Sequence, residues 1–321
     1  MTSKPYFFAL IAIFFGVVCF GAGYGQSRKS DPGENAARMQ SFVKDISRYA
    51  RTINPNFIII PQNGAELAFN NAEPDKGVMA SYVAAIDGIG IEELFYNGSL
   101  KIDRERLAML RELKNSVTIM VSDFVSKDAN LFDAVQRNIN EGFIAFPRSS
   151  KNYDYKLIPG GSPTDVNTDT ITSLTKAKNY LYLISTDEYK NKEDMITAIK
   201  VTNYDVVLID LFFDGIPFTQ DEVQQLKTKA NGGTRLVICY VSIGSAEEYR
   251  YYWQPGWKKG NPPWLKKNYE GYPDEFWVEY WNPEWQDIIF SNDGSYIKKI
   301  MNAGFDGAYL DNVEAYYFLG K

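Results

Sequence analysis

Acidic side chains follow several apolar runs of this 321-residue chain, at the points where the runs end. Asp123, Asp210 and Asp311 each end such a run, and Glu66 and Glu247 follow two others within a few residues. A single acid there is more often a helix cap or a solvated loop charge. A converging set is costly, because like charges repel. Two carboxyl groups across a cleft are the minimal equipment for cleaving a glycosidic bond.

The composition narrows the chemistry further. The chain has no His, which excludes Ser-His-Asp and Cys-His catalysis and His-ligated metals. Its two Cys cannot form a cluster, and the net charge of -6 argues against a nucleic-acid partner. We therefore expect carboxylates as the acid–base groups, no metal or other cofactor, and no nucleic acid bound. No protein partner is implied, and a monomer is expected.

Aromatic residues are concentrated in one stretch. All six Trp lie between Trp253 and Trp285, and Tyr280 is one of several Tyr among them. Sugar rings present apolar C–H faces that stack on aromatic planes, so the stretch predicts a carbohydrate-binding loop. The alternative is a self-packed subdomain with these rings as its core. Both interpretations can hold at once.

The elements that must position these residues follow from the apolar pattern. Eight short runs, apolar on both faces, are typical of buried parallel strands and lie at 57–60, 82–90, 117–123, 142–147, 180–185, 205–210, 235–242 and 305–311. Amphipathic helices are predicted between them, at 36–52, 103–114, 128–140, 189–201, 219–230 and 284–302. This alternation predicts an α/β protein, a (β/α)8 TIM barrel with its site at the carboxyl ends of the strands. Asn282-Pro283-Glu284 and Thr219 with Glu222 predict helix starts.

The chain divides into unequal parts. Residues 1–25 predict a signal peptide, residues 26–33 a linker, and residues 34–321 a single domain. We expect an exported protein, with an uncleaved membrane anchor as the alternative. Residues 148–179 are rich in Gly, Pro, Thr and Asn and predict a long surface connection, with one short helix near 170–178. The segment looks like a join between two ends.

Five longer motifs carry a family resemblance. They are VICYVSIGSAEEYRYYW (237–253), EYWNPEWQDIIF (279–290), GFDGAYLDNVEAYYF (304–318), IIIPQNGAEL (58–67) and IEELFY (91–96). Together they resemble glycoside hydrolase family 114, whose characterised members are endo-α-1,4-polygalactosaminidases. The likeness extends over nearly everything from about residue 34 onward.

The order of these motifs differs from that of the family. In the family, the segment resembling 180–185 comes first, and the PQN and ELFY motifs follow the YLDN motif; here PQN and ELFY come first and YLDN last. The resemblance therefore implies a circular permutation. The helix that the family places after YLDN would be 36–52. Residues 148–179 would bridge the old ends.

The resemblance also implies a function. It implies hydrolysis of an α-1,4-linked, galactosamine-containing polysaccharide by two carboxylates, endo-acting and retaining, with Asp311 expected as nucleophile and Glu66 as acid/base. Residues expected to hold the sugar are Asp210, Tyr240, Ser242, Glu247, Gln62, Asn63, Tyr96, Asp123, Asn312, Trp253 and Tyr280. The alternative is a non-catalytic carbohydrate-binding barrel, which would keep the aromatic loop without needing the two carboxylates at working distance.

Overall fold

The computed structural model describes residues 32–149, 153 and 155–319. The predicted signal peptide, and the linker apart from its last two residues, lie outside the described residues. In the part that is described, no helix has the length and apolar character needed to cross a membrane.

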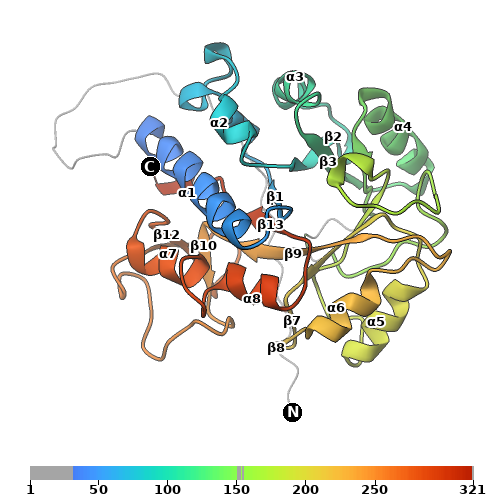
Figure 1. Ribbon diagram of the computed structural model, residues 1–321. Helices are drawn as coiled ribbons and strands as arrows, with labels where there is room; N and C mark the ends of the chain where they lie inside the picture. The colour runs from blue at the N-terminus through green and yellow to red at the C-terminus, as the bar shows by residue number, and fades with distance from the viewer. Residues whose placement is uncertain (1–31, 150–152, 154, 320–321) are drawn as a thin grey trace.

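Eight parallel strands form two sheets, one of five strands and one of three. The larger sheet has the order β1-β13-β9-β6-β5, and the smaller has the order β2-β3-β4. Their bounds are β1 Ile58–Pro61, β2 Gly88–Leu100, β3 Thr118–Val125, β4 Ile144–Ala145, β5 Tyr180–Tyr182, β6 Val206–Asp210, β9 Leu236–Ser242 and β13 Gly307–Asp311. Each of the eight predicted strands therefore has a counterpart, and β13 and β9 run side by side through the molecule (Figure 1).

The two sheets meet at β1 and β2. Gln62 forms a parallel bridge with Gly90, and the Asn63 amide donates to the Gly90 carbonyl at 2.7 Å. A Cβ on Gly90 would lie 1.8 Å from the Tyr309 hydroxyl, so no larger residue fits where β13 approaches β2. The tight contact joins the sheets without a continuous ladder.

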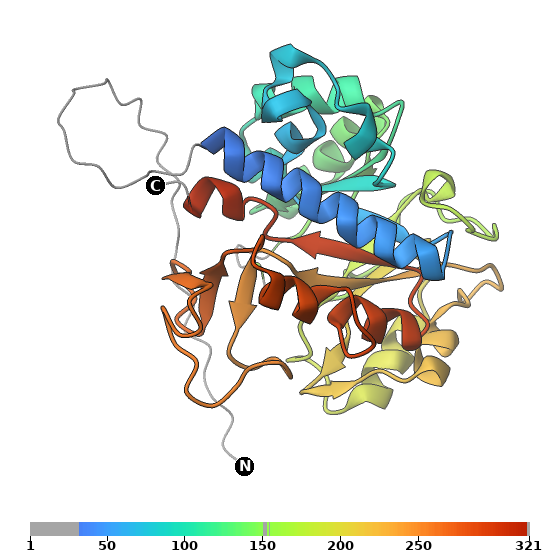
Figure 2. The same ribbon diagram turned by 60° about the vertical axis from the view of Figure 1, so that its left-hand side comes forward.

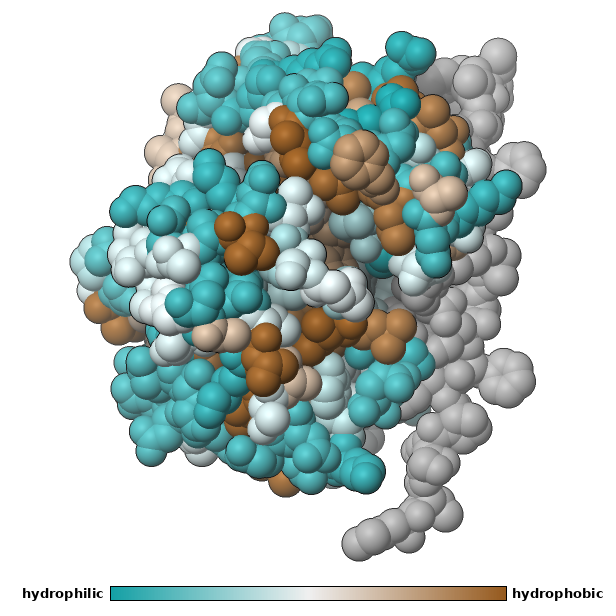
Figure 3. Space-filling view, turned by 90° about the vertical axis from the view of Figure 1, so that its right-hand side faces the viewer, coloured by the Kyte–Doolittle hydropathy of each residue, from teal (hydrophilic) through white to brown (hydrophobic). Residues whose placement is uncertain are grey.

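The predicted closed barrel is not confirmed, because the described sheets do not close. Among the described residues β4 pairs with β3 alone and β5 with β6 alone. β4 has two residues and β5 has three, and each pairs on one side alone. Aromatic side chains occupy this seam instead, with the Phe146 and Tyr180 ring centroids 5.5 Å apart. Viewed from the side of α4 and α5, hydrophobic side chains border a hollow (Figure 3).

Helices cover the sheets and keep to the predicted order. They are α1 Pro32–Ile53, α2 Ala80–Val83, α3 Arg104–Leu113, α4 Leu131–Glu141, α5 Lys192–Lys200, α6 Gln220–Leu226, α7 Pro283–Ile289, α8 Tyr296–Asn302 and α9 Ala315–Leu319. Both predicted starts are confirmed: Asn282 caps α7, and Thr219 with Glu222 forms a capping box on α6. The first and last helices, α1 and α9, pack side by side (Figure 2).

Three predicted elements are wrong in detail. The run 82–90 begins in the short helix α2, and its strand starts only at Gly88. The predicted helix 284–302 is two helices, because a turn around Ser291, whose φ is 92°, interrupts it. The short helix near 170–178 is a single 3-10 turn at Leu174–Lys176.

The aromatic stretch forms a small antiparallel sheet of its own. Its order is β10 (Ser245–Glu247), β12 (Glu275–Val278) and β11 (Leu265–Asn268). Trp264, Trp277 and Trp285 are buried, which supports the self-packed alternative for these three rings. A second small hairpin, β7 (Phe212–Phe213) with β8 (Ile216–Pro217), follows β6.

Candidate active site

Asp311 ends β13 beside Ser242, at the carboxyl ends of the five-stranded sheet. The Tyr240 hydroxyl donates to its Oδ2 at 2.5 Å, and the Asn312 amide donates to its Oδ1 at 2.7 Å. The residue is partly exposed, although protein surrounds the carboxyl group on most sides. Asp311 thus combines a fixed orientation with access from outside.

The surroundings of Asp311 raise its pKa to about 7. Burial is the largest cause, and the negative charges of Glu92 and Glu247 add to it, while the Tyr240 hydroxyl and the Asn312 amide act in the opposite direction. An acid with a pKa near neutrality is suited to proton transfer at that pH.

Glu92, in β2, is the carboxylate with the strongest effect on Asp311. The Tyr155 hydroxyl donates to its Oε1 at 2.5 Å, and the Asn63 side-chain amide donates to its Oε2 at 3.3 Å. Asn63 also accepts from the Glu92 backbone amide at 3.2 Å. Donors on both oxygens hold the Glu92 carboxylate in one orientation.

Glu66 belongs to a neighbouring group. It lies in the 3-10 turn Ala65–Ala68 and accepts a hydrogen bond from the Tyr316 hydroxyl. Its charge acts on Glu314, whose pKa is raised to about 8 by burial, by Glu66 and, more weakly, by Glu92 and Asp311. Glu66 therefore acts on Glu314 and Tyr316, whereas Glu92 is the glutamate that most strongly raises the pKa of Asp311.

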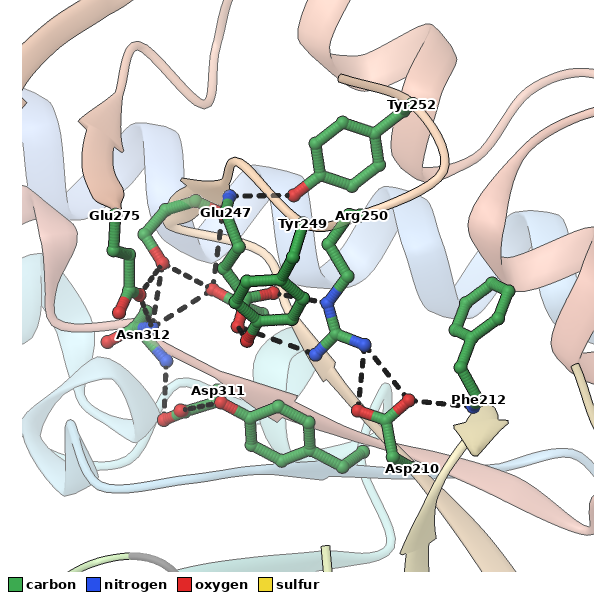
Figure 4. A network of polar contacts seen from close by, with 12 residues as sticks. Asp210, Phe212, Glu247, Tyr249, Arg250, Tyr252, Glu275, Asp311 and Asn312 are labelled. Atoms are coloured by element: carbon green, nitrogen blue, oxygen red, sulfur yellow. Dashed lines mark hydrogen bonds and ion pairs between the residues drawn. The ribbon is translucent and has the colours of Figure 1, made fainter. Parts of the chain in front are cut away.

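An arginine organises the carboxylates beside Asp311. Arg250 donates to both oxygens of Asp210 at 2.9 and 2.8 Å, and its Nε donates to Glu247 at 2.6 Å (Figure 4). The Tyr249 hydroxyl also donates to Glu247. Bidentate pairing of this kind fixes both carboxylates in orientation.

Asn312 links the strand end to the small sheet. Its side-chain amide donates to the hydroxyls of Ser242 and Ser245, each at 2.9 Å, and to Glu275 at 3.2 Å. The pKa of Glu275 is raised well above its usual range, chiefly by burial and then by the charge of Glu247. The aromatic-rich insertion therefore brings a further acidic group to this site (Figure 4).

Tyrosines form the buried side of the site. The Tyr155 ring stacks on Tyr182 with centroids 3.7 Å apart, and Tyr182 meets Tyr309 edge-on at 5.4 Å. The Tyr182 hydroxyl donates to Gln62 at 2.9 Å. Gln62, predicted to bind sugar, is buried and holds this wall in place.

Four predicted sugar-binding residues lie away from this group. Asp123 is buried and accepts from the backbone amides of Phe95 and Tyr96, and the Tyr96 hydroxyl donates to Asp133 at 2.6 Å. Tyr280 is fully buried, and its hydroxyl donates to the carbonyl of a residue in α1. Trp253 packs against other rings of the small sheet. The contacts of Asp123, Tyr96 and Tyr280 indicate packing roles, since these side chains are buried and hydrogen-bonded within the protein, whereas Trp253 is only partly buried.

The structure also adds residues to the site. Glu92 lies within the IEELFY motif and Arg250 within the motif at 237–253, but neither is among the residues that the sequence analysis expects at the site. Glu275 and Tyr155 had no local signal, because they come from an insertion and from the bridging segment. Within the described residues, no group of three or more Cys, Asp or Glu side chains is arranged to hold a metal ion.

Parallel strands with paired carboxyl groups at their carboxyl ends define an α/β protein suited to acid–base hydrolysis. Residues 147–319 match the model of glycoside-hydrolase family GH114, which is more than half of the chain. The chain belongs to this family. Asp210, Glu247 and Asp311 lie inside the matched range, whereas Glu66 and Glu92 lie outside it.

Three curated relatives resemble the chain, and all three are described as uncharacterized proteins. The similarity is 35% identity over 155 residues to a protein of Methanocaldococcus jannaschii, 38% over 122 residues to one of Deinococcus radiodurans, and 31% over 120 residues to one of Thermotoga maritima. These matches take in 47%, 38% and 37% of this chain and 42%, 37% and 36% of the relatives. The chain thus spans less than half of each relative's length.

Proposed function

We propose that this family member is an exported glycosidase that cleaves an α-1,4-linked, galactosamine-containing polysaccharide, with Asp311 and Glu92 as the working pair. The observation that carries the proposal is the placement of Asp311 at the end of β13, where the Tyr240 hydroxyl and the Asn312 backbone amide hold its carboxyl group; burial and the charge of Glu92 also raise its pKa to about 7. Membership of the glycoside-hydrolase family supports the reaction class. Glu66, expected as the second catalytic group, becomes the rival candidate.

The raised pKa of Asp311 favours it as the holder of the proton that the resting pair shares at neutral pH. In the proposed retaining reaction, Asp311 gives this proton to the glycosidic oxygen while Glu92 attacks the anomeric carbon, and the C–O bond breaks. Water then attacks the resulting ester and returns a proton to Asp311, which frees Glu92. These roles reverse the nucleophile assignment expected for Asp311.

The acidic surroundings support an amino-sugar substrate. Glu66 and Glu247 lie in the groups adjoining the pair and add to the negative charge of Glu92, and Arg250, which also pairs with Asp210, offsets only part of this charge. A protonated amine is attracted by such a field, whereas an acidic sugar is repelled. We therefore propose a partly deacetylated, cationic polymer, cut at internal linkages.

We also infer that the fold is a circularly permuted barrel. Starting from β5, the spatial order of the strands is β5-β6-β9-β13-β1, and the bridge from Gln62 to Gly90 continues it to β2-β3-β4. The family match begins at residue 147, where the bridging segment starts, and ends in α9, beside α1. In this proposal α1 serves as the helix that follows β13.

The export proposal rests on residues 1–25 of the sequence, with an uncleaved anchor as the alternative. Amino-terminal sequencing of the protein recovered outside the cytoplasm tests it. A start near residue 26 is expected, and an intact amino terminus in the membrane fraction contradicts cleavage.

The function is tested by incubating the purified domain with galactosamine-containing and other amino-sugar polymers and sizing the products. We expect oligosaccharides from the galactosamine polymer, with internal cuts appearing early. Binding of the polymer without any cleavage, under conditions where the protein is folded, supports a carbohydrate-binding protein instead.

A further inference from the structure

Two tyrosines of the bridging segment reach two adjacent glutamates of β2. The Tyr153 hydroxyl donates to Glu93 at 2.9 Å, and the Tyr155 hydroxyl donates to Glu92 at 2.5 Å. Arg148, at the start of the segment, also donates to Glu93, at 2.7 Å. The segment predicted as a mere join therefore contacts the candidate active site directly.

Tyr155 is held firmly in its place. Its side chain is buried, its ring stacks on Tyr182 at 3.7 Å, and its backbone carbonyl accepts from the Ile184 amide at 3.0 Å. Its φ of 42° is unusual for a residue other than glycine and costs free energy that surrounding contacts must offset. Its hydroxyl also contacts Ser122 at 3.1 Å. Backbone, ring and hydroxyl are thus all constrained.

Several charged groups face Glu92 besides Tyr155. Asp311, Glu314 and Glu93 are carboxyl neighbours, Arg148 is a positively charged neighbour, and the Arg106 guanidinium donates to the Glu92 carbonyl at 2.8 Å. The phenols of Tyr153 and Tyr272, and the buried tyrosines of β5 and β13, lie in the same field. Burial and the charge of Glu92 raise the pKa of Tyr155 well above its usual range, so its hydroxyl stays a proton donor at any working pH.

We propose that Tyr155 is a positioning residue that fixes the carboxylate of Glu92 in one orientation for its role in the pair with Asp311. This inference rests on the proposed function only in naming the pair as catalytic. A hydrogen bond donated by a fixed phenol restricts the rotation of a carboxylate, and its loss leaves the Glu92 carboxylate with the longer bond from Asn63, at 3.3 Å. The connection between the two halves of the chain then completes the site as well as joining them.

The test compares Tyr155→Phe with Tyr153→Phe in the full domain. Both changes remove one hydroxyl and keep the ring, but only the first removes a bond to Glu92. We follow the side-chain carboxyl carbons of Glu92 and Asp311 by NMR during a pH titration, together with kcat and KM on the cleaved polymer. The NMR readout needs no substrate.

We expect Tyr155→Phe to move the titration of Asp311 to lower pH, because a Glu92 carboxylate that is no longer held in place raises the pKa of Asp311 less, and to lower kcat about tenfold with KM within about twofold. Tyr153→Phe should change none of these. Unchanged carboxyl titrations in a folded Tyr155→Phe variant overturn the inference. Shifted titrations in a protein that cleaves no polymer uphold the positioning role and refute the proposed function.

Discussion

A carboxyl group at the end of a strand can serve chemistry or packing, and Asp311 and Asp123 show the two outcomes. Asp311 is partly exposed and held by a phenol, with a second carboxylate close enough to raise its pKa. Asp123 is buried, and its carboxylate oxygens accept hydrogen bonds from two backbone amides and from the Asn138 side chain. The apolar pattern predicted both at strand ends; Asp311 does end β13, whereas β3 continues two residues past Asp123, to Val125. The residues next to Asp311 and Asp123 in the sequence do not indicate which hydrogen-bond donors contact each carboxylate.

Asp123→Ala should therefore act on stability. The change leaves the amides of Phe95 and Tyr96 buried without their acceptor, which costs about 2–4 kcal/mol of unfolding free energy. KM for the polymer should stay within about twofold, since no sugar contact is lost. Urea unfolding and kinetics measure both, with the exposed Asp128→Ala as control. A stable variant with a strongly raised KM contradicts the packing role.

Glu314 makes stability depend on pH. Its pKa in the folded protein is about 8, above the usual value of 4.5, so the folded state holds the proton more tightly. The associated stability is complete below about pH 4 and is lost as the pH rises through 8. Glu314→Gln removes this dependence and should raise the unfolding free energy by about 1–3 kcal/mol at pH 9, after a discount for partial exposure.

Thermal unfolding of Glu314→Gln and of the parent at pH 4 and pH 9 checks this prediction. The exposed Glu248→Gln serves as the control and should shift neither curve. The prediction is wrong if the gain from Glu314→Gln at pH 9 is no larger than the gain at pH 4.

At the scale of elements, the spacing of apolar residues predicted which strands and helices exist better than it predicted where each begins and ends. The eight strands were found because each is a short apolar run, and the cap of α6 because Thr219 and Glu222 have the right spacing. The break between α7 and α8 has a signal in the sequence, because residues 291–295 read Ser-Asn-Asp-Gly-Ser, a run of turn-forming residues, and the chain turns at Ser291. The full length of β2 was missed because two glutamates interrupt its apolar pattern, its pairing with β3 shifts register between Glu92 and Asn97, and its last four residues lie largely exposed.

The capping box of α6 should make a measurable contribution to the free energy of unfolding. Thr219→Ala removes the acceptor for the Glu222 amide and should lower the unfolding free energy by about 1 kcal/mol, whereas Thr219→Ser keeps an oxygen and should cost less. Urea unfolding of the two variants decides this. Equal losses from both would show that the methyl group of Thr219, rather than its hydroxyl, stabilises the helix start.

At the scale of the whole molecule, the bridging segment has to span from β4 to β5. It is anchored by Lys229, which is fully buried and donates to Asn167 of the segment and to Asp205, all at 2.9 Å. Its composition predicted a long connection correctly. The open seam could not be predicted, because the length of the ladder at β4 and β5 depends on how this segment packs rather than on the strands' own residues.

The proposed permutation predicts that the family order can be restored. A chain that begins at the exposed Gly161, runs to Leu319 and continues through a short Gly-Ser linker into α1 should fold, because α1 and α9 already pack together. Circular dichroism and thermal unfolding should match the parent within about 10 °C. A control opened inside β9, which is buried, should not fold. Failure of the restored order with linkers of several lengths contradicts the permutation.

The most direct test of the account is hydrolysis of a galactosamine polymer by the parent and by Asp311→Asn, Glu92→Gln and Glu66→Gln, with folding of each variant verified. The account predicts that the parent releases oligosaccharides, that Asp311→Asn and Glu92→Gln each lose about a thousandfold or more in kcat, and that Glu66→Gln stays within about tenfold of the parent. Near-normal cleavage by Asp311→Asn, or by Glu92→Gln while Glu66→Gln is inactive, contradicts it.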